Sequence, residues 1–251
     1  MIRRQIQSLI VIIIITLSCK NRTPDGQITN ITSNLKVTFE NSEEYKFNDA
    51  EKEEIRKIAI KADKELRTLL PGLNKNLVLK SKPVPFDLGI VGGVTGRANT
   101  PNEVIAEISF KYEGGVIAAV NQSLSGHIYH EFHHVWKGWT LSENKFDKGI
   151  YIAAINEGLA DVFSKTYTGH FLDIGSQSDD IKGWTKEVLK LPKDADYNRW
   201  MNQHEDGRLA IGYRVGTFIV ENAMKNSEMT ILELSNLTPN EILKLSRLEE
   251  K

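Results

Sequence analysis

The chain has 251 residues and a formal net charge of −1, from 32 basic and 33 acidic residues. This balance lacks the excess of positive charge that is typical of nucleic-acid binding. Its single cysteine excludes both a disulfide framework and a zinc site built from several thiolates, so any metal site must be built from histidines and carboxylates.

The first residues have the pattern of an export signal. Arg3 and Arg4 precede an apolar stretch that is shorter than the about 20 residues of a membrane span. Cys19 follows directly. Its position resembles a bacterial lipobox, in which the cysteine is lipidated and becomes the mature N-terminus, although Thr16 stands where leucine is usual. We expect residues 1–18 to be a signal peptide and the exported protein to be held at the membrane of a bacterial cell envelope by a lipid on Cys19. An ordinary signal peptide or an uncleaved anchor is the alternative.

Residues 19–34 are polar and rich in turn formers, which predicts a flexible tether. Residues 35–251 are enough for one domain. Its first predicted elements are a strand over Leu35–Phe39, a helix from the capping box at Asn48 to Leu70, and a strand over Asn76–Lys80.

The next segment predicts a β-hairpin. Residues 88–96 are apolar and interrupted by glycines, residues 104–110 form a strong strand pattern, and Thr100–Asn102 is a turn between them. Gly92 and Gly93 suit a close approach of another backbone, such as an extended peptide added to the sheet edge. Alternatively, they only allow bulges or tight turns.

A predicted helix over Gln122–Lys137 contains the pattern H-E-x-x-H at residues 130–134. His130 and His134 are one helical turn apart, so both imidazoles face the same point and can hold a zinc ion. Glu131 then lies where a carboxylate can take a proton from a water on the metal. The pattern indicates a hydrolase site that still needs a third ligand.

A second predicted helix, Tyr151–Tyr167, offers two carboxylates on one face, at Glu157 and Asp161. The helix is strongly apolar, and an unpaired buried carboxylate is costly. One of the two can therefore reach the metal, while the other can accept a hydrogen bond from the far nitrogen of a ligand histidine.

Two further histidines complicate this assignment. His127 lies three residues before His130 and could replace Glu157 as a ligand, but one helix rarely supplies three ligands to a tetrahedral metal. We therefore expect His127 to be a polar residue near the helix start. We expect His133 to point away from the metal or to add a bond to a ligand.

The two motifs together resemble the gluzincins, in which H-E-x-x-H is followed by N-E-x-x-x-D. Residues 130–136, 157–161 and 212–216 resemble, more closely, the YjaZ-like predicted zinc-dependent proteases. The resemblance implies zinc ligation by His130, His134 and Glu157. It also implies that Glu131 is the general base and that Asp161 lies behind a ligand histidine.

Hydrolysis of an amide also needs a donor for the developing oxyanion. The candidates are His204, Tyr213 and Arg214. The resemblance favours Tyr213, because it places a Gly-Tyr pair there, although Tyr213 could equally be a packing residue.

The sequence thus predicts an α+β, zincin-like domain. We expect an N-terminal lobe with a small, mostly antiparallel sheet and helices, a C-terminal helical lobe, and a Zn²⁺ site in the cleft between them. The predicted activity is zinc-dependent cleavage of a peptide or protein substrate by a monomer. The alternatives are a non-catalytic zinc-binding or interaction protein and a metal-dependent hydrolase of another amide or ester.

Overall fold

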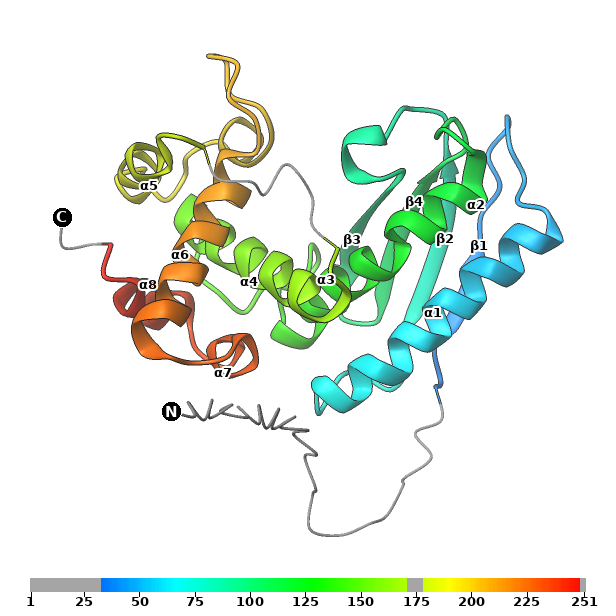
Figure 1. The fold of residues 1–251 in the computed structure, drawn as a ribbon, viewed down its shortest axis with the longest axis horizontal. Coiled ribbons are helices and arrows are strands. Elements are labelled where there is room, and N and C mark those ends of the chain that lie inside the picture. Colours follow the sequence, from blue (N-terminus) through cyan, green and yellow to red (C-terminus); the bar gives the residue numbers. More distant parts are fainter. Residues whose placement is uncertain (1–32, 171–177, 249–251) are drawn as a thin grey trace, which may run out of the picture. The chain divides into compact units, whose positions relative to one another are not determined.

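The computed structural model describes residues 33–170 and 178–248 (Figure 1). The predicted signal peptide, Cys19 and all but the last two residues of the predicted tether lie outside these ranges. Within them, no helix is both long enough and apolar enough to cross a membrane.

The sheet has four strands in the order β1-β2-β4-β3. Their bounds are β1 (Lys36–Phe39), β2 (Val78–Val84), β3 (Val94–Thr100) and β4 (Glu103–Ser109). β3 and β4 form the predicted antiparallel hairpin, with its turn at Pro101 and Asn102.

The expectation of a mostly antiparallel sheet is wrong, because β1–β2 and β2–β4 are both parallel. Helix α1 (Asp49–Leu69) lies between β1 and β2 in the chain and returns it to the same end of the sheet, as a parallel pair requires. The hairpin then places β4, rather than β3, beside β2. Alternation of apolar residues predicts which face of a strand is buried, but it does not determine the partner strand.

Helices cover one face of this sheet, where α1 and α3 (Ser125–Lys137) lie across it (Figure 1). A 3₁₀ turn, η1 (Gly89–Val91), precedes β3. A short helix, α2 (Gly115–Ala119), and a π-helical turn, η2 (Val120–Leu124), lead into α3. The side chain of Phe132, in the middle of α3, is fully buried, so this helix is held firmly in the core.

The C-terminal half of the described chain is helical. Its elements are α4 (Ile150–Thr168), α5 (Ile181–Leu189), the π-helical turn η4 (Asn198–Asn202), α6 (Ile211–Ser227), α7 (Ile231–Ser235) and α8 (Pro239–Ser246). The predicted capping box at Asn48 is formed, and Thr238 forms another at the start of α8. The described chain is therefore α+β, as predicted, with a mixed sheet followed by a helical half.

Helices α4 and α6 cross at two glycines, Gly158 and Gly216. A Cβ atom built on Gly216 would lie only 1.7 Å from the carbonyl oxygen of Ala154, and one on Gly158 would lie 2.2 Å from the carbonyl carbon of Gly216. Backbone therefore packs directly on backbone at this crossing. This contact sets the position of α6 relative to the carboxylates of α4.

Candidate metal centre

Helix α3 presents two imidazoles to one point. The Nε2 atoms of His130 and His134 are 2.9 Å apart, and both side chains are buried. The helix ends at Gly138, whose positive φ of 76° lets the chain turn back. A regular helix over the whole motif is what keeps the two rings one turn apart.

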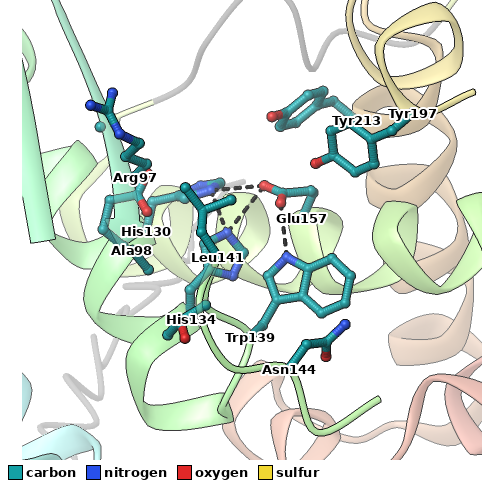
Figure 2. A pocket seen from close by; sticks show the side chains of 13 residues that line it. Arg97, Ala98, His130, His134, Trp139, Leu141, Asn144, Glu157, Tyr197 and Tyr213 are labelled. Atoms are coloured by element: carbon teal, nitrogen blue, oxygen red, sulfur yellow. Dashed lines mark hydrogen bonds and ion pairs between the residues drawn. The ribbon is translucent and has the colours of Figure 1, made fainter. Parts of the chain in front are cut away.

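Helix α4 brings a carboxylate to the same point. Glu157 Oε2 lies 3.1 Å from the Nε2 atom of each histidine (Figure 2). The ligand atoms of His130, His134 and Glu157 all lie within 4.8 Å of one another, so the group can hold a metal ion. The structure therefore brings together the three residues that the sequence singled out as ligands.

The donor set fits zinc in both type and spacing. Tetrahedral zinc with bonds of about 2.0–2.1 Å separates neighbouring ligand atoms by roughly 3.4 Å. The three atoms here are 2.9–3.1 Å apart. Asp161 Oδ1 lies 2.9 Å from His130 Nδ1. With a proton on Nδ1 donated to this carboxylate, a neutral His130 turns a lone pair on Nε2 toward the other ligands.

The charges around the site also favour a cation. Burial alone would lower the pKa of His130, but the hydrogen bonds to Asp161 and Glu157 outweigh it and hold that pKa well above its usual value. Burial likewise opposes ionisation of Glu157, yet the nearby His134 and His130 lower its pKa below the usual range. Together with Glu131, three carboxylates surround two imidazoles, and a bound cation offsets their mutual repulsion.

Glu131 lies against the edge strand β3 and lines a cavity beside the three ligands. Burial raises the pKa of this carboxyl, while the nearby His130 and His134 and, to a smaller extent, the backbone of Ala98 oppose the shift. A Cβ atom on Gly96 would lie 2.9 Å from Glu131 Cγ, so only glycine lets the side chain lie flat on the strand. The sequence could not reveal this role of Gly96, because it depends on how a helix and a strand pack.

Gly92 and Gly93, in contrast, do not face the cavity. Both have a positive φ, and their Cβ positions are filled by Ser123 at Gly92 and by Ala119 and Tyr112 at Gly93. These contacts favour the alternative interpretation, a tight turn that packs beside η2, over a close approach to a substrate.

The cavity beside the ligands has a volume of about 310 Å³. Edge strand β3, helices α3 and α4, the loop after α3, and two tyrosines surround it (Figure 2). Tyr213 reaches it from α6. The negative charge of Glu157 and burial raise the pKa of Tyr213 well above its usual value, so its hydroxyl keeps its proton. Tyr197 lies beside Tyr213 on the same wall (Figure 2), and the sequence had given no sign of it.

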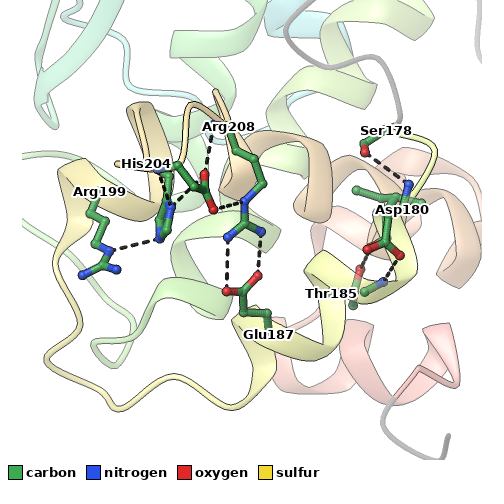
Figure 3. Close-up of polar contacts among 10 residues, drawn as sticks. Ser178, Asp180, Thr185, Glu187, Arg199, His204 and Arg208 are labelled. Carbon is green, nitrogen blue, oxygen red and sulfur yellow. Dashed lines mark hydrogen bonds and ion pairs between the residues drawn. The ribbon is translucent and has the colours of Figure 1, made fainter.

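The other two oxyanion candidates are not among the residues that line this cavity. His204 lies in a separate polar network (Figure 3), where Arg199 Nε donates to its Nε2 at 3.1 Å. Its Nδ1 lies 2.9 Å from Asp206 Oδ1. Asp206 and Glu187 in turn hold Arg208. None of the residues of this network lines the cavity beside the ligands. Arg214 follows Tyr213 on α6.

The remaining histidines of α3 have partners elsewhere. His127 Nε2 lies 3.3 Å from the carbonyl oxygen of Val91, and burial lowers its pKa to about 3. His133 donates from Nε2 to Ser235 Oγ at 2.9 Å, at the corner between α7 and α8. Lys137 donates to the carbonyl oxygens of Ser235, at 2.6 Å, and Leu237 at the same corner. The side of α3 that carries His133 and Lys137 is therefore hydrogen-bonded to the corner between α7 and α8.

Two buried imidazoles and a carboxylate that converge beside a cavity define a metal-binding protein with an α+β fold. Residues 116–244, a little more than half of the chain, match the family described as Predicted Zn-dependent protease (DUF2268). The chain belongs to this family, which confirms the resemblance to the YjaZ-like predicted zinc-dependent proteases. Comparisons with curated proteins and with solved structures gave no match.

Proposed function

We propose that the protein is a zinc-dependent peptidase of the gluzincin type, with His130, His134 and Glu157 as ligands and Glu131 as general base. One observation carries this proposal. The three ligand atoms lie within 4.8 Å of one another, and Glu131 lines the cavity beside them. A site that only stored zinc would not need this additional carboxylate beside the ligands.

Zinc held here would polarise the scissile carbonyl and lower the pKa of a water molecule toward neutrality. Glu131 then accepts the proton of that water and delivers it to the leaving amine. Burial raises the pKa of Glu131, which brings it closer to the working pH of a general base. The backbone contact with Ala98 keeps its carboxylate oriented while the proton moves.

Tyr213 is the donor that we assign to the oxyanion. Its hydroxyl stays protonated because the charge of Glu157 raises its pKa, so it can donate a hydrogen bond to negative charge that develops in the cavity that Tyr213 lines. Tyr197, on the same wall, has its pKa raised by burial and by the charges of Glu157 and Glu131, so it keeps its proton as well.

A peptide or protein substrate suits the edge of β3. Gly93 O accepts a hydrogen bond from Ser109 N, so along this antiparallel pair the polar backbone groups of Gly96 point away from β4, toward the cavity. An extended peptide can add to the sheet there. Beyond Gly96 the edge is already in use, because Leu141 N donates to Ala98 O at 3.0 Å.

We also propose that the protein is exported and anchored by a lipid on Cys19, in keeping with the pattern of its first residues. The mass of the mature protein, extracted from the membrane fraction, checks this. A mature chain that begins elsewhere and carries no lipid would reject it.

Glu131→Gln tests the peptidase proposal. On a mixed peptide library we expect the parent to lose cleavage with a chelator and to regain it with zinc. The variant should bind one equivalent of zinc and cleave about 10²–10⁴ times more slowly. If the zinc-loaded variant cleaves as fast as the parent, Glu131 is not the base and the mechanism is wrong. If the parent binds zinc but cleaves only other amides or esters, the protein is a metal-dependent hydrolase of those compounds. If it binds zinc and cleaves nothing, it is a non-catalytic zinc-binding or interaction protein.

A further inference from the structure

The loop after α3 carries a side chain that contacts a proposed ligand directly. Trp139 Nε1 donates a hydrogen bond to Glu157 Oε1 at 3.1 Å (Figure 2). The other oxygen, Oε2, faces the two imidazoles at 3.1 Å. The two oxygens of one carboxylate therefore have separate partners, the indole on one side and the ligand cluster on the other.

This indole is itself held in place. The backbone N–H of Trp139 donates to the carbonyl oxygen of His134 at 2.9 Å, at the end of the metal helix. Two residues further on, the loop pairs with the edge strand through Leu141 N to Ala98 O, at 3.0 Å. The Trp139 ring also packs against Phe146, with ring centroids 6.2 Å apart. The indole N–H is thus fixed before any metal arrives.

A glutamate that is free to rotate about its last side-chain bond can turn either oxygen, or both, toward a cation. A fixed donor at one oxygen removes this freedom, and a hydrogen bond to a charged acceptor in a buried site is strong. We propose that Trp139 is a positioning residue for the metal centre, which holds Glu157 so that only Oε2 faces the ion. This inference rests on the metal ligation assigned under the proposed function.

The same loop reaches the proposed general base by a second route. Ala98 accepts from Leu141 through its carbonyl oxygen, and Ala98 and the proposed general base Glu131 line the same cavity. The connection between the two ligand-bearing helices therefore holds Glu157 by a side chain and also contacts the strand that lies beside Glu131.

Trp139→Phe tests the inference, and Trp136→Phe is a matched control. The control loses an equivalent indole hydrogen bond, from Trp136 Nε1 to Pro71 O at 3.0 Å, away from Glu157. Zinc affinity is measured by competition with a chromophoric chelator. Groups that orient a ligand typically contribute 10–100-fold to metal affinity, so we expect Trp139→Phe to weaken zinc binding by about that factor and the control by less than about threefold.

A second measurement needs no substitution at Trp139. The chain has four tryptophans. In ¹⁵N-labelled parent protein, the indole N–H signal of Trp139, assigned by elimination with Phe variants of the other three, should move on addition of Zn²⁺ while the others stay. The inference is overturned if this signal does not move, or if Trp139→Phe binds zinc as tightly as the control. Zinc binding without peptide cleavage would reject only the proposed function, whereas no zinc binding by the parent would reject both.

Discussion

Gly216→Ala should destabilise the protein and disturb the metal centre, because Gly216 is where α6 touches the backbone of α4. The new methyl group would lie 1.7 Å from the carbonyl oxygen of Ala154, whereas ordinary contacts of a Cβ atom begin at 3.4 Å. To restore such a contact, the two helices would have to separate by about 1.7 Å, the difference between these distances.

The size of the effect follows from two opposing contributions. Overpacking costs typically 1–3 kcal/mol, and a backbone carbonyl cannot rotate away as a side chain can, so we take about 3 kcal/mol. Alanine is favoured over glycine in a helix by about 1 kcal/mol. The free energy of unfolding should therefore fall by about 2 kcal/mol. Because α6 carries Tyr213 and α4 carries Glu157, a misplacement of 1 Å or more should also lower kcat/KM by about 100-fold.

Urea unfolding followed by circular dichroism measures the loss of stability. We expect a lower midpoint urea concentration and an unchanged dependence of the unfolding free energy on urea concentration. Gly183→Ala in α5 is the control. Its methyl group meets only the carboxylate of Asp180, a side chain that can move, so we expect a change within about 1 kcal/mol. If Gly216→Ala has the parent's unfolding free energy and activity, close backbone contact is not what this glycine provides.

Two further predictions concern the histidines of α3. Asp161→Asn should weaken zinc binding by about 10–100-fold, because the variant loses the carboxylate that lies 2.9 Å from His130 Nδ1 and orients the ring. An unchanged zinc affinity in competition with a chelator would contradict this prediction. The second uses pH. Burial lowers the pKa of His127 to about 3, so between pH 6.5 and that value the unfolded chain binds a proton that the folded chain does not, and stability falls as the pH falls. Between pH 6.5 and 5, this histidine should lower the free energy of unfolding by about 2 kcal/mol. The free energy of unfolding should therefore depend more steeply on pH for the parent than for His127→Gln. Equal slopes for the two proteins would rule the explanation out.

Local spacing explains why so much of the metal centre was predictable. The distance between His130 and His134 along a helix is set by helix geometry alone, and the same holds for Glu157 and Asp161. The structure then needed only to bring two helices together. The hairpin and the capping boxes were also predictable, because each depends on a few neighbouring residues.

Features that depend on the approach of distant segments were not predictable. The parallel pairing of β2 with β4 depends on which strand of the hairpin lies beside β2, and the alternation of apolar residues does not determine this. Gly96, Tyr197 and Trp139 become notable only once a strand, a turn and a loop surround the same cavity. Gly92 and Gly93 were candidates for a close approach of substrate because they are glycines beside a strand. In the structure, both have a positive φ and lie in a tight turn.

The fastening of α3 to the corner between α7 and α8 determines when the site can exist. Lys137 and the carbonyl oxygen of Ser235 that it contacts are 98 positions apart in the chain. Without that corner, the ammonium group of Lys137 and the ring of His133 would lose these hydrogen-bond partners. A nascent chain that has just passed Glu157 already contains every proposed ligand but lacks the corner that contacts α3. The peptidase that we propose would therefore be complete only once residues 231–246 have been made and packed against α3.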